Sequence, residues 1–331
     1  MPWPRSVNPM IEFQTVPEPD KAMFTSLSVL APTNPFYTAE YADFRRIAGY
    51  QPWAFLLKEN GRISTGCTAF LKNGVLSRSL EIASVPSFQA SEAFWAGLME
   101  FCRRHRISDL CVNSFSSEQT RIPMFAPETW RKQRREFVIR LQHPDLWKAM
   151  TKGHSYCIKR GRKAGLQTRW QTSESACIEH ARLVGASMVR RQQRGEKVSA
   201  ISEQRFYLDI VHSGAGALYQ AMLDDRAISS SVILRAPKGA YLHSLGSDGE
   251  GMKIGAAHFL LYELGNELKA QSVDVLNLGG TEETEGGLVQ FKTGFGASTV
   301  TFSLEAAHFV LDNRWARYLR SAVGRIRSRF H

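Results

Sequence analysis

Hydrophobic positions along the chain recur at two spacings, which predict an alternation of helices and strands. In the first half, the expected elements are a helix at 38–50, strands at 52–58, 62–71 and 75–84, a helix at 91–105, and strands at 109–115 and 137–141. Asn60-Gly61 and Asn73-Gly74 are each typical of the two-residue turn that joins antiparallel strands. This order of elements indicates an α/β domain built on a mixed sheet.

The second half repeats this theme. Its expected elements are helices at 144–164, 173–194, 202–213 and 253–270, and strands at 166–170, 217–223, 228–234, 241–246 and 273–278. The basic, irregular stretch 119–135 is expected to connect the two halves. Because no repeat is visible residue by residue, the duplication lies in the order of the elements.

One segment, 274–296, differs in kind from the rest of the chain. A short apolar strand leads into an acidic loop whose glycines, at 279, 280, 286, 287, 294 and 296, permit unusual backbone angles. Order is expected to resume at Phe291-Lys292, with Phe295 close behind. An ammonium held partly out of water by such neighbours stabilises an anion better than an exposed one does. The alternative is a glycine-rich hairpin with a surface lysine.

The composition is that of a globular protein with room for two domains. The chain has 331 residues, of which 43% are hydrophobic and 22% are charged. No apolar run reaches the length of about 18 residues that a membrane-spanning helix needs, and the first nine residues lack the pattern of a secretory signal. Five cysteines without paired spacing indicate free thiols in a reducing compartment, so a cytoplasmic location is expected. The scattered histidines predict no zinc site.

The net charge of +11 favours polyanionic partners, which include nucleic acid, anionic lipid and phosphorylated substrates. Basic residues at Lys159, Arg160, Arg162 and Lys163 form a candidate surface for tRNA or for an anionic membrane. The tail carries six arginines around one apolar stripe, made of Trp315, Leu319, Val323, Ile326 and Phe330. This pattern predicts an amphipathic helix that lies on a membrane or packs on the protein.

Two motifs carry a resemblance to a known family. The first is N-L-G-G…G-L-V-Q-F-K-T-G-F-G, which ends at Gly296. The second runs from the strand at 137–141, through Asp145-Leu-Trp-Lys, to I-K-R-G-R-K-A-G-L at 158–166. Together they resemble the Fem-type peptidoglycan aminoacyltransferases, which are double-domain members of the GNAT acyltransferase superfamily. The resemblance covers roughly residues 35 to 305.

The resemblance implies a mixed α/β fold with two tandem GNAT-like domains plus a C-terminal amphipathic helix. The expected ranges are 1–33 for an N-terminal lead and first strand, 34–143 and 144–307 for the two domains, and 308–331 for the basic helix. It implies that Lys292 acts in the transition state and that Phe291 orders it. Asn277, Gly279, Gly280 and Phe295 are expected to contribute to the substrate site.

Two expected roles stay open. The family strand commonly has Asp two residues before the Gly-Gly pair, but this chain has Asn277, which puts a carboxylate role there in doubt. His243 is a candidate base for the attacking amine, or else a structural strand histidine. For the pyrophosphate of a nucleotide- or lipid-linked acceptor, the candidates are Arg190, Arg191 and Arg194, which share part of one helix face. A solvated charged face is the alternative.

The donor is expected to be a co-substrate, with no resident cofactor. The stretch 246–257 has the glycines of a GNAT pyrophosphate loop, but Asp248 and Glu250 would repel a pyrophosphate. The resemblance implies aminoacyl-tRNA as one candidate donor, for transfer onto a lipid- or nucleotide-linked cell-envelope precursor. The alternatives are an acyl-CoA-dependent N-acyltransferase of exopolysaccharide biosynthesis and a non-enzymatic scaffold at the membrane surface.

Overall fold

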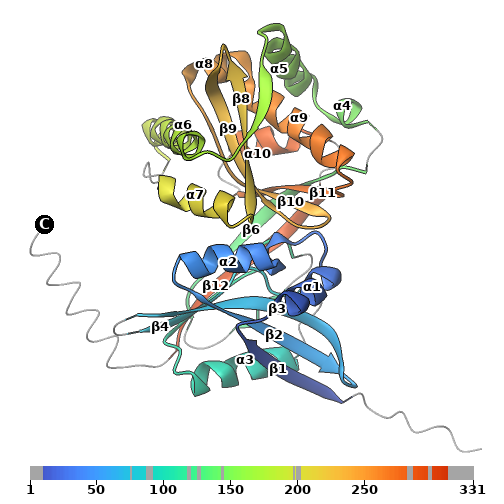
Figure 1. Ribbon diagram of the computed structural model, residues 1–331, viewed down its shortest axis with the longest axis vertical. Coiled ribbons are helices and arrows are strands. Elements are labelled where there is room, and N and C mark those ends of the chain that lie inside the picture. The colour runs from blue at the N-terminus through green and yellow to red at the C-terminus, as the bar shows by residue number, and fades with distance from the viewer. Residues whose placement is uncertain are drawn as a thin grey trace, which may run out of the picture. The chain divides into compact units, whose positions relative to one another are not determined.

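The chain forms two compact units, each discontinuous in sequence, in a computed structural model (Figure 1). The structure describes residues 10–74, 77–86, 92–117, 121–124, 128–142, 145–196, 198, 203–281, 286–296 and 300–311. Unit 1 holds residues up to Leu30, 48–133 and those from Ser303, whereas unit 2 holds 31–47 and 134–302. The predicted ranges were continuous and differ from these units at three places: 31–47 and 134–143 belong with unit 2, and 303–310 belongs with unit 1.

Unit 1 is built on the sheet order β1-β2-β3-β4-β5-β12. Its elements are β1 (Ile11–Pro17), α1 (Lys21–Leu30), β2 (Gln51–Glu59), β3 (Arg62–Asn73), β4 (Arg78–Ile82), α3 (Glu92–Arg104), β5 (Asp109–Asn113) and most of β12 (Val300–Val310). The β2–β3 turn has Asn60 and Gly61 at φ 50° and 79°, as the predicted turn type requires. At the second predicted turn, Asn73 instead belongs to β3.

Unit 2 is built on the sheet order β7-β8-β9-β10-β11-β6. Its strands are β6 (Glu128–Arg140, from Arg134), β7 (Gln167–Gln171), β8 (Gly216–Leu223), β9 (Arg226–Arg235), β10 (Gly239–Ser247) and β11 (Val275–Thr281). Its helices are η1 (Pro35–Tyr37), α2 (Ala39–Ile47), α4 (Leu146–Ala149), α5 (Lys152–Lys163), α6 (Glu174–Gln193), α7 (Gln204–His212), α8 (Gly249–Ile254), α9 (Ala256–Ala270) and α10 (Gly286–Thr293).

The two units share one topology, which confirms the duplication predicted from the order of elements. In unit 1, successive neighbours from β1 to β4 are antiparallel, β4 and β5 are parallel, and β12 is antiparallel to β5. In unit 2, β7 to β10 are antiparallel, β10 and β11 are parallel, and β6 is antiparallel to β11. The last strand of unit 1, β12, comes from far outside that unit's main run, and the last strand of unit 2, β6, begins its run but pairs with β11 near the end of it. A pattern read along the chain does not reveal either pairing.

Three predicted segments differ in the structure. The stretch 119–135, predicted to be irregular, contains the start of β6 at Glu128. The predicted helix at 144–164 divides into α4 and α5, because Thr151 is extended (ψ 154°) and its side chain caps the new helix at the His154 amide. The tail predicted as a basic helix contributes His308 to β12, and its remainder from residue 312 lies outside the described residues.

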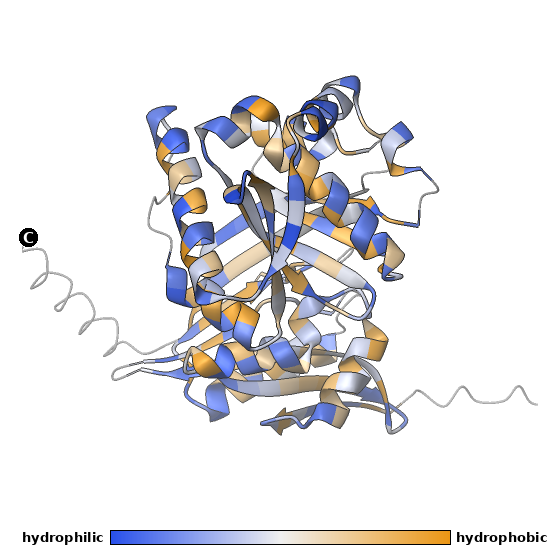
Figure 2. Ribbon diagram, turned by 45° about the horizontal axis from the view of Figure 1, so that its top comes forward, coloured by the Kyte–Doolittle hydropathy of each residue, from blue (hydrophilic) through white to orange (hydrophobic). Residues whose placement is uncertain are grey.

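The core of unit 2 positions the functional site. Apolar residues of β6, β8, β9, β10 and β11 pack with α5 and α9 in one cluster, whereas α6 packs on β9 and β10 through its own contacts (Figure 1). Polar and apolar positions divide the faces of these helices, as Figure 2 shows in blue and orange. The end of β11 and the turn that follows α10 complete this cluster, since Leu278 and Phe295 are both buried in it.

Candidate active site

Lys292 lies on α10 with its side chain buried, at 5% exposure. Its Nζ donates hydrogen bonds to the carbonyl oxygens of Gly279 (2.9 Å) and Gly280 (3.0 Å) on β11. The ammonium also lies 5.8 Å from the ring centre of Phe137 on β6. A surface lysine on a hairpin is therefore excluded, and the predicted desolvated ammonium is what the structure has.

The helix that carries Lys292 is fixed by His154 of α5. The His154 Nε2 lies 2.8 Å from the Phe291 carbonyl oxygen, so it donates there, and Nδ1 then accepts from the Thr151 hydroxyl at 3.1 Å. This places the proton of neutral His154 on Nε2. A Cβ on Gly294 would stand 2.0 Å from the His154 ring, which explains why the F-K-T-G motif has glycine there.

Phe291 and Phe295 form an aromatic cluster with two histidines. His154 lies 4.5 Å from His258 and 4.7 Å from Phe295 between ring centres, and His258 lies 4.9 Å from Phe291. The sequence predicted that the Phe291 ring would order Lys292. The ring that faces the ammonium is instead that of Phe137, whereas Phe291 orders the helix through its ring and its carbonyl.

These two histidines make the stability of unit 2 depend on pH. Desolvation lowers the pKa of both, and the nearby His154 and Arg160 help to bring the pKa of His258 to about 4. Since this value lies below the ordinary 6.5, the folded state binds fewer protons than the unfolded state. The stability that His258 contributes is therefore complete above pH 6.5 and is lost as the pH falls toward 4.

We expect His258 alone to make unfolding about 2 kcal/mol easier at pH 5 than at pH 7, by proton linkage. Urea unfolding of the wild type and of His258→Phe at both pH values measures this. The variant should lose less stability on acidification than the wild type, while His212→Phe, on the surface of α7, should behave as the wild type. An equal loss in all three proteins would contradict the assignment.

Sequence reasoning missed Glu136, the buried carboxylate beside the site. It is fully buried on β6, where Tyr241 donates its hydroxyl to Oε1 (2.9 Å) and Asn277 donates its amide to Oε2 (2.8 Å). Glu136 follows two arginines at the start of an apolar run. An acidic residue at that position is only a weak sign of a functional site, because the register of the strand decides whether its side chain faces solvent or the interior.

A chain of hydrogen bonds connects Glu136 to Lys292. Because Asn277 gives its amide hydrogen to Glu136, its Oδ1 faces the other way and accepts from the Gly279 amide at 2.8 Å. Gly279 has φ 72°, and here the register of β11 against β6 shifts between Asn277 and Gly280. The two carbonyl groups at this bulge, those of Gly279 and Gly280, accept the hydrogen bonds from Lys292. Asn277 thus serves as the link between a carboxylate and the glycine bulge.

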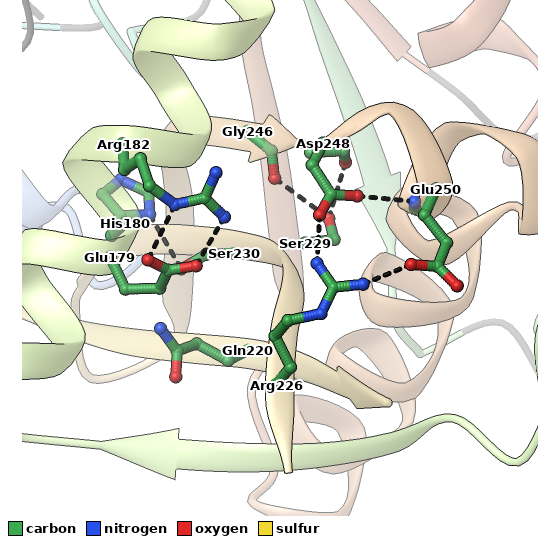
Figure 3. Close-up of polar contacts among 12 residues, drawn as sticks. Glu179, His180, Arg182, Gln220, Arg226, Ser229, Ser230, Gly246, Asp248 and Glu250 are labelled. Atoms are coloured by element: carbon green, nitrogen blue, oxygen red, sulfur yellow. Dashed lines mark hydrogen bonds and ion pairs between the residues drawn. The ribbon is translucent and has the colours of Figure 1, made fainter. Parts of the chain in front are cut away.

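His243 is placed away from this network. Among the described residues, no hydrogen bond or ring contact joins it to Lys292; its ring lies 5.1 Å from that of Phe206 on α7. Its side chain keeps access to solvent, although desolvation by the surrounding protein lowers its pKa to about 4. The buried histidine beside it is His180. Its Nδ1 lies 2.8 Å from the Ser230 hydroxyl (Figure 3), and its Nε2 lies 2.8 Å from the Ser244 hydroxyl.

The three candidate arginines of α6 do not act as one cluster. Arg190 donates to the Ser247 carbonyl and to the Ser187 hydroxyl, which ties α6 to the end of β10. Arg191 and Arg194 share Glu196, at 2.5 Å and 2.8 Å. Arg190 is thus engaged by the protein, and the charge of the other two is partly balanced. The acidic loop residues at 282–285 lie outside the described residues.

The turn from β10 into α8 satisfies its own polar groups. Asp248 caps α8 by accepting from the Gly251 amide at 2.8 Å, and Arg226 bridges Asp248 and Glu250 (Figure 3). The Ser247 amide is likewise taken, by the Ser187 hydroxyl at 3.0 Å. A carboxylate of the protein therefore occupies the helix start that would receive a phosphate in a GNAT pyrophosphate loop.

Comparison with known proteins agrees with this fold. Residues 149–293 match the family model described as an acetyltransferase (GNAT) domain. Among solved structures, FemX superposes with a TM-score of 0.68 at 10% identity, over 90% of this chain and 97% of that one. The C-terminal domain of a putative lysylphosphatidylglycerol synthetase from Agrobacterium fabrum gives 0.53 at 14% identity, over 91% and 95%. A tandem GNAT protein from the clavulanic acid biosynthesis pathway gives 0.51 at 11% identity, over 92% and 100%.

Residues 149–293 therefore match a GNAT domain, and the chain as a whole has the tandem GNAT fold that these solved structures share. The tandem GNAT-like fold that the resemblance implied is thereby confirmed. No curated protein matches the sequence. In the part of the chain that the structure describes, no helix is long and apolar enough to cross a membrane.

Proposed function

We propose that this protein is an N-acyltransferase that moves an aminoacyl group from aminoacyl-tRNA onto an amino group of a cell-envelope precursor. The observation that carries the proposal is the buried ammonium of Lys292, fixed by two carbonyls at the end of β11. A charge placed in such a site has been desolvated in advance, so it needs no reorganisation during reaction. It can therefore stabilise negative charge that appears in the transition state.

The proposed reaction is aminolysis of an ester. The acceptor's amine attacks the carbonyl carbon of the aminoacyl ester, which forms the C–N bond and moves an electron pair onto the carbonyl oxygen. Lys292 stabilises that oxyanion. As the pair returns, the ester C–O bond breaks, and the departing ribose oxygen takes up the proton that the amine loses. The products are an amide and a free tRNA hydroxyl, so no metal or redox partner is needed for balance.

The choice of donor rests on the turn after β10. A CoA pyrophosphate at this turn would have to displace Asp248 from the Gly251 amide and would meet the charge of Glu250. Arg226 lowers this repulsion but holds both carboxylates in place. Like charges at a phosphate site oppose binding, so aminoacyl-tRNA is favoured over acyl-CoA.

Isothermal titration of the full chain with CoA and with aminoacyl-tRNA tests this choice. We expect heat of binding with the tRNA and none with CoA at concentrations up to the millimolar range. The variant Asp248→Asn/Glu250→Gln, which removes both acids, is the matched control for repulsion. Tight binding of CoA by the wild type would contradict the donor assignment and favour the acyl-CoA-dependent alternative.

The class of acceptor is supported by fold similarity. One similar structure is named FemX, and another is the C-terminal domain of a putative lysylphosphatidylglycerol synthetase, whose name refers to a lipid that carries an amino acid. We therefore place the acceptor among lipid- or nucleotide-linked envelope precursors that carry an amine. Asn277 in place of an acid keeps a non-enzymatic scaffold as the alternative, but Glu136 provides a buried carboxylate hydrogen-bonded to that residue. This favours the enzyme.

A further inference from the structure

The outer face of α5 carries cations that the fold does not use. The residues at 152, 156, 159 and 163 are spaced by four, three and four, and all four side chains are exposed. They therefore form one stripe along the helix, made of Lys152, Tyr156, Lys159 and Lys163. The opposite face is buried, through His154, Ile158 and Gly161. α5 contains five cations and no acid, and it is among the bluest helices in Figure 2.

Acidic side chains do not balance this stripe. The acid that reaches α5 from α9 is Glu263, and Arg162 binds it at 2.8 Å. Among the described residues, no ion pair involves Lys152, Lys159 or Lys163. The Lys159 Nζ lies 5.7 Å from the ring centre of Trp147, a contact that positions the lysine side chain without neutralising its charge. Three lysines thus remain available to an anionic partner.

An aromatic ring lies within the stripe, and an unsatisfied donor lies beside that ring. Tyr156 is 64% exposed, and the guanidinium carbon of Arg160 lies 5.7 Å from its ring centre. The Arg160 Nε is buried and has no hydrogen-bond partner in the described part of the chain. Buried donors are normally satisfied, so this one indicates a missing acceptor. Cations that alternate with an exposed aromatic ring are typical of surfaces that bind phosphate backbones and stack bases.

A membrane fits this stripe less well than a nucleic acid does. A helix that lies in a lipid interface presents a broad apolar face to the acyl chains. The apolar face of α5 is instead buried against α9, since Gly161 approaches Phe259 so closely that a Cβ there would lie 3.1 Å from it. The outward stripe offers one aromatic ring and otherwise charge.

We propose that the outer stripe of α5 binds the phosphate backbone of an RNA, which is the tRNA of the donor if the proposed function holds. The same helix fixes α10 from its buried face, through His154 and the Phe291 carbonyl. An RNA on the stripe therefore lies about one helix diameter, some 10 Å, from the helix that carries Lys292. Binding there brings the ester end of an aminoacyl donor near the ammonium.

The test is fluorescence anisotropy of the full chain with a labelled RNA hairpin that ends in single-stranded CCA, over a series of salt concentrations. Lys152→Gln/Lys163→Gln should weaken binding by about tenfold and reduce the slope of log K against log salt by about 2. Tyr156→Ala should weaken binding with little change in that slope. The control Lys21→Gln/Lys253→Gln removes two other exposed lysines and should match the wild type.

Two results would overturn the proposal: unchanged RNA affinity and slope in Lys152→Gln/Lys163→Gln, or no salt-dependent binding by the wild type. Phosphatidylglycerol vesicles serve as a second probe, and a loss restricted to vesicle binding would assign the stripe to lipid instead. Lys292→Met should bind the hairpin as the wild type does. If α5 binds RNA but no aminoacyl transfer occurs, the proposed reaction fails while this surface stands.

Discussion

Glu136→Ala is expected to lower the free energy of unfolding by about 3 kcal/mol or more, because it removes the acceptor of two buried donors. These donors are the Tyr241 hydroxyl and the Asn277 amide. The substitution also frees Asn277 to rotate, so the Gly279 bulge and the two carbonyls that hold Lys292 lose their support. Urea unfolding measures the stability, and the transfer rate should fall with it.

Glu136→Gln separates charge from hydrogen bonding. A glutamine can accept from Asn277 and donate to the Tyr241 oxygen, so its cost should be less than half that of the alanine variant. Glu12→Ala, at an exposed position of β1, is the surface control and should change stability by no more than about 0.5 kcal/mol. Equal stabilities for Glu136→Ala and Glu12→Ala would show that Glu136 does not support the bulge.

Lys292→Met is expected to reduce the rate of acyl transfer by about 10²- to 10³-fold, the usual effect of removing one donor to an oxyanion. Methionine keeps most of the volume and the apolar stem but carries no charge. Steady-state rates of the variant and the wild type with the same substrates measure the effect, and thermal unfolding shows whether the variant keeps its fold. A fall in stability with an unchanged rate would assign Lys292 to structure alone.

Lys292→Arg tests whether position matters as well as charge. The guanidinium is larger and planar, so it fits poorly between two carbonyls set for an ammonium. We expect it to restore only part of the activity. Lys253→Met, at an exposed position of α8, should keep the full rate.

Much of the fold could be predicted from local pattern. The spacing of apolar residues and the Asn60-Gly61 turn act within a few residues, so the sequence displays them directly. The pairing of β6 and β12 could not be predicted, because each pairs with a strand far away in sequence. Pairing of that kind is decided by tertiary packing, and local propensity carries no record of it.

The residues of the site likewise include some that the sequence could predict and some that it could not. Lys292 was found through a motif, and its burial follows from the glycines that let β11 present two carbonyls. Glu136 and His154 were missed because their roles depend on contacts with residues more than a hundred positions away, Asn277 and Phe291. The substrate-binding role of Arg190, Arg191 and Arg194 stays a prediction. Helical spacing placed these residues correctly, but it could not show that Glu196 and Ser247 engage them.

The most direct test of the Lys292 mechanism is a single-turnover experiment with excess enzyme and the donor–acceptor pair that the wild type uses. It measures the rate constant of amide formation separately from donor binding, which anisotropy reports on its own. We predict that Lys292→Met slows amide formation at least a hundredfold while donor affinity stays the same. An unchanged rate constant in a folded variant that still binds the donor would contradict the account.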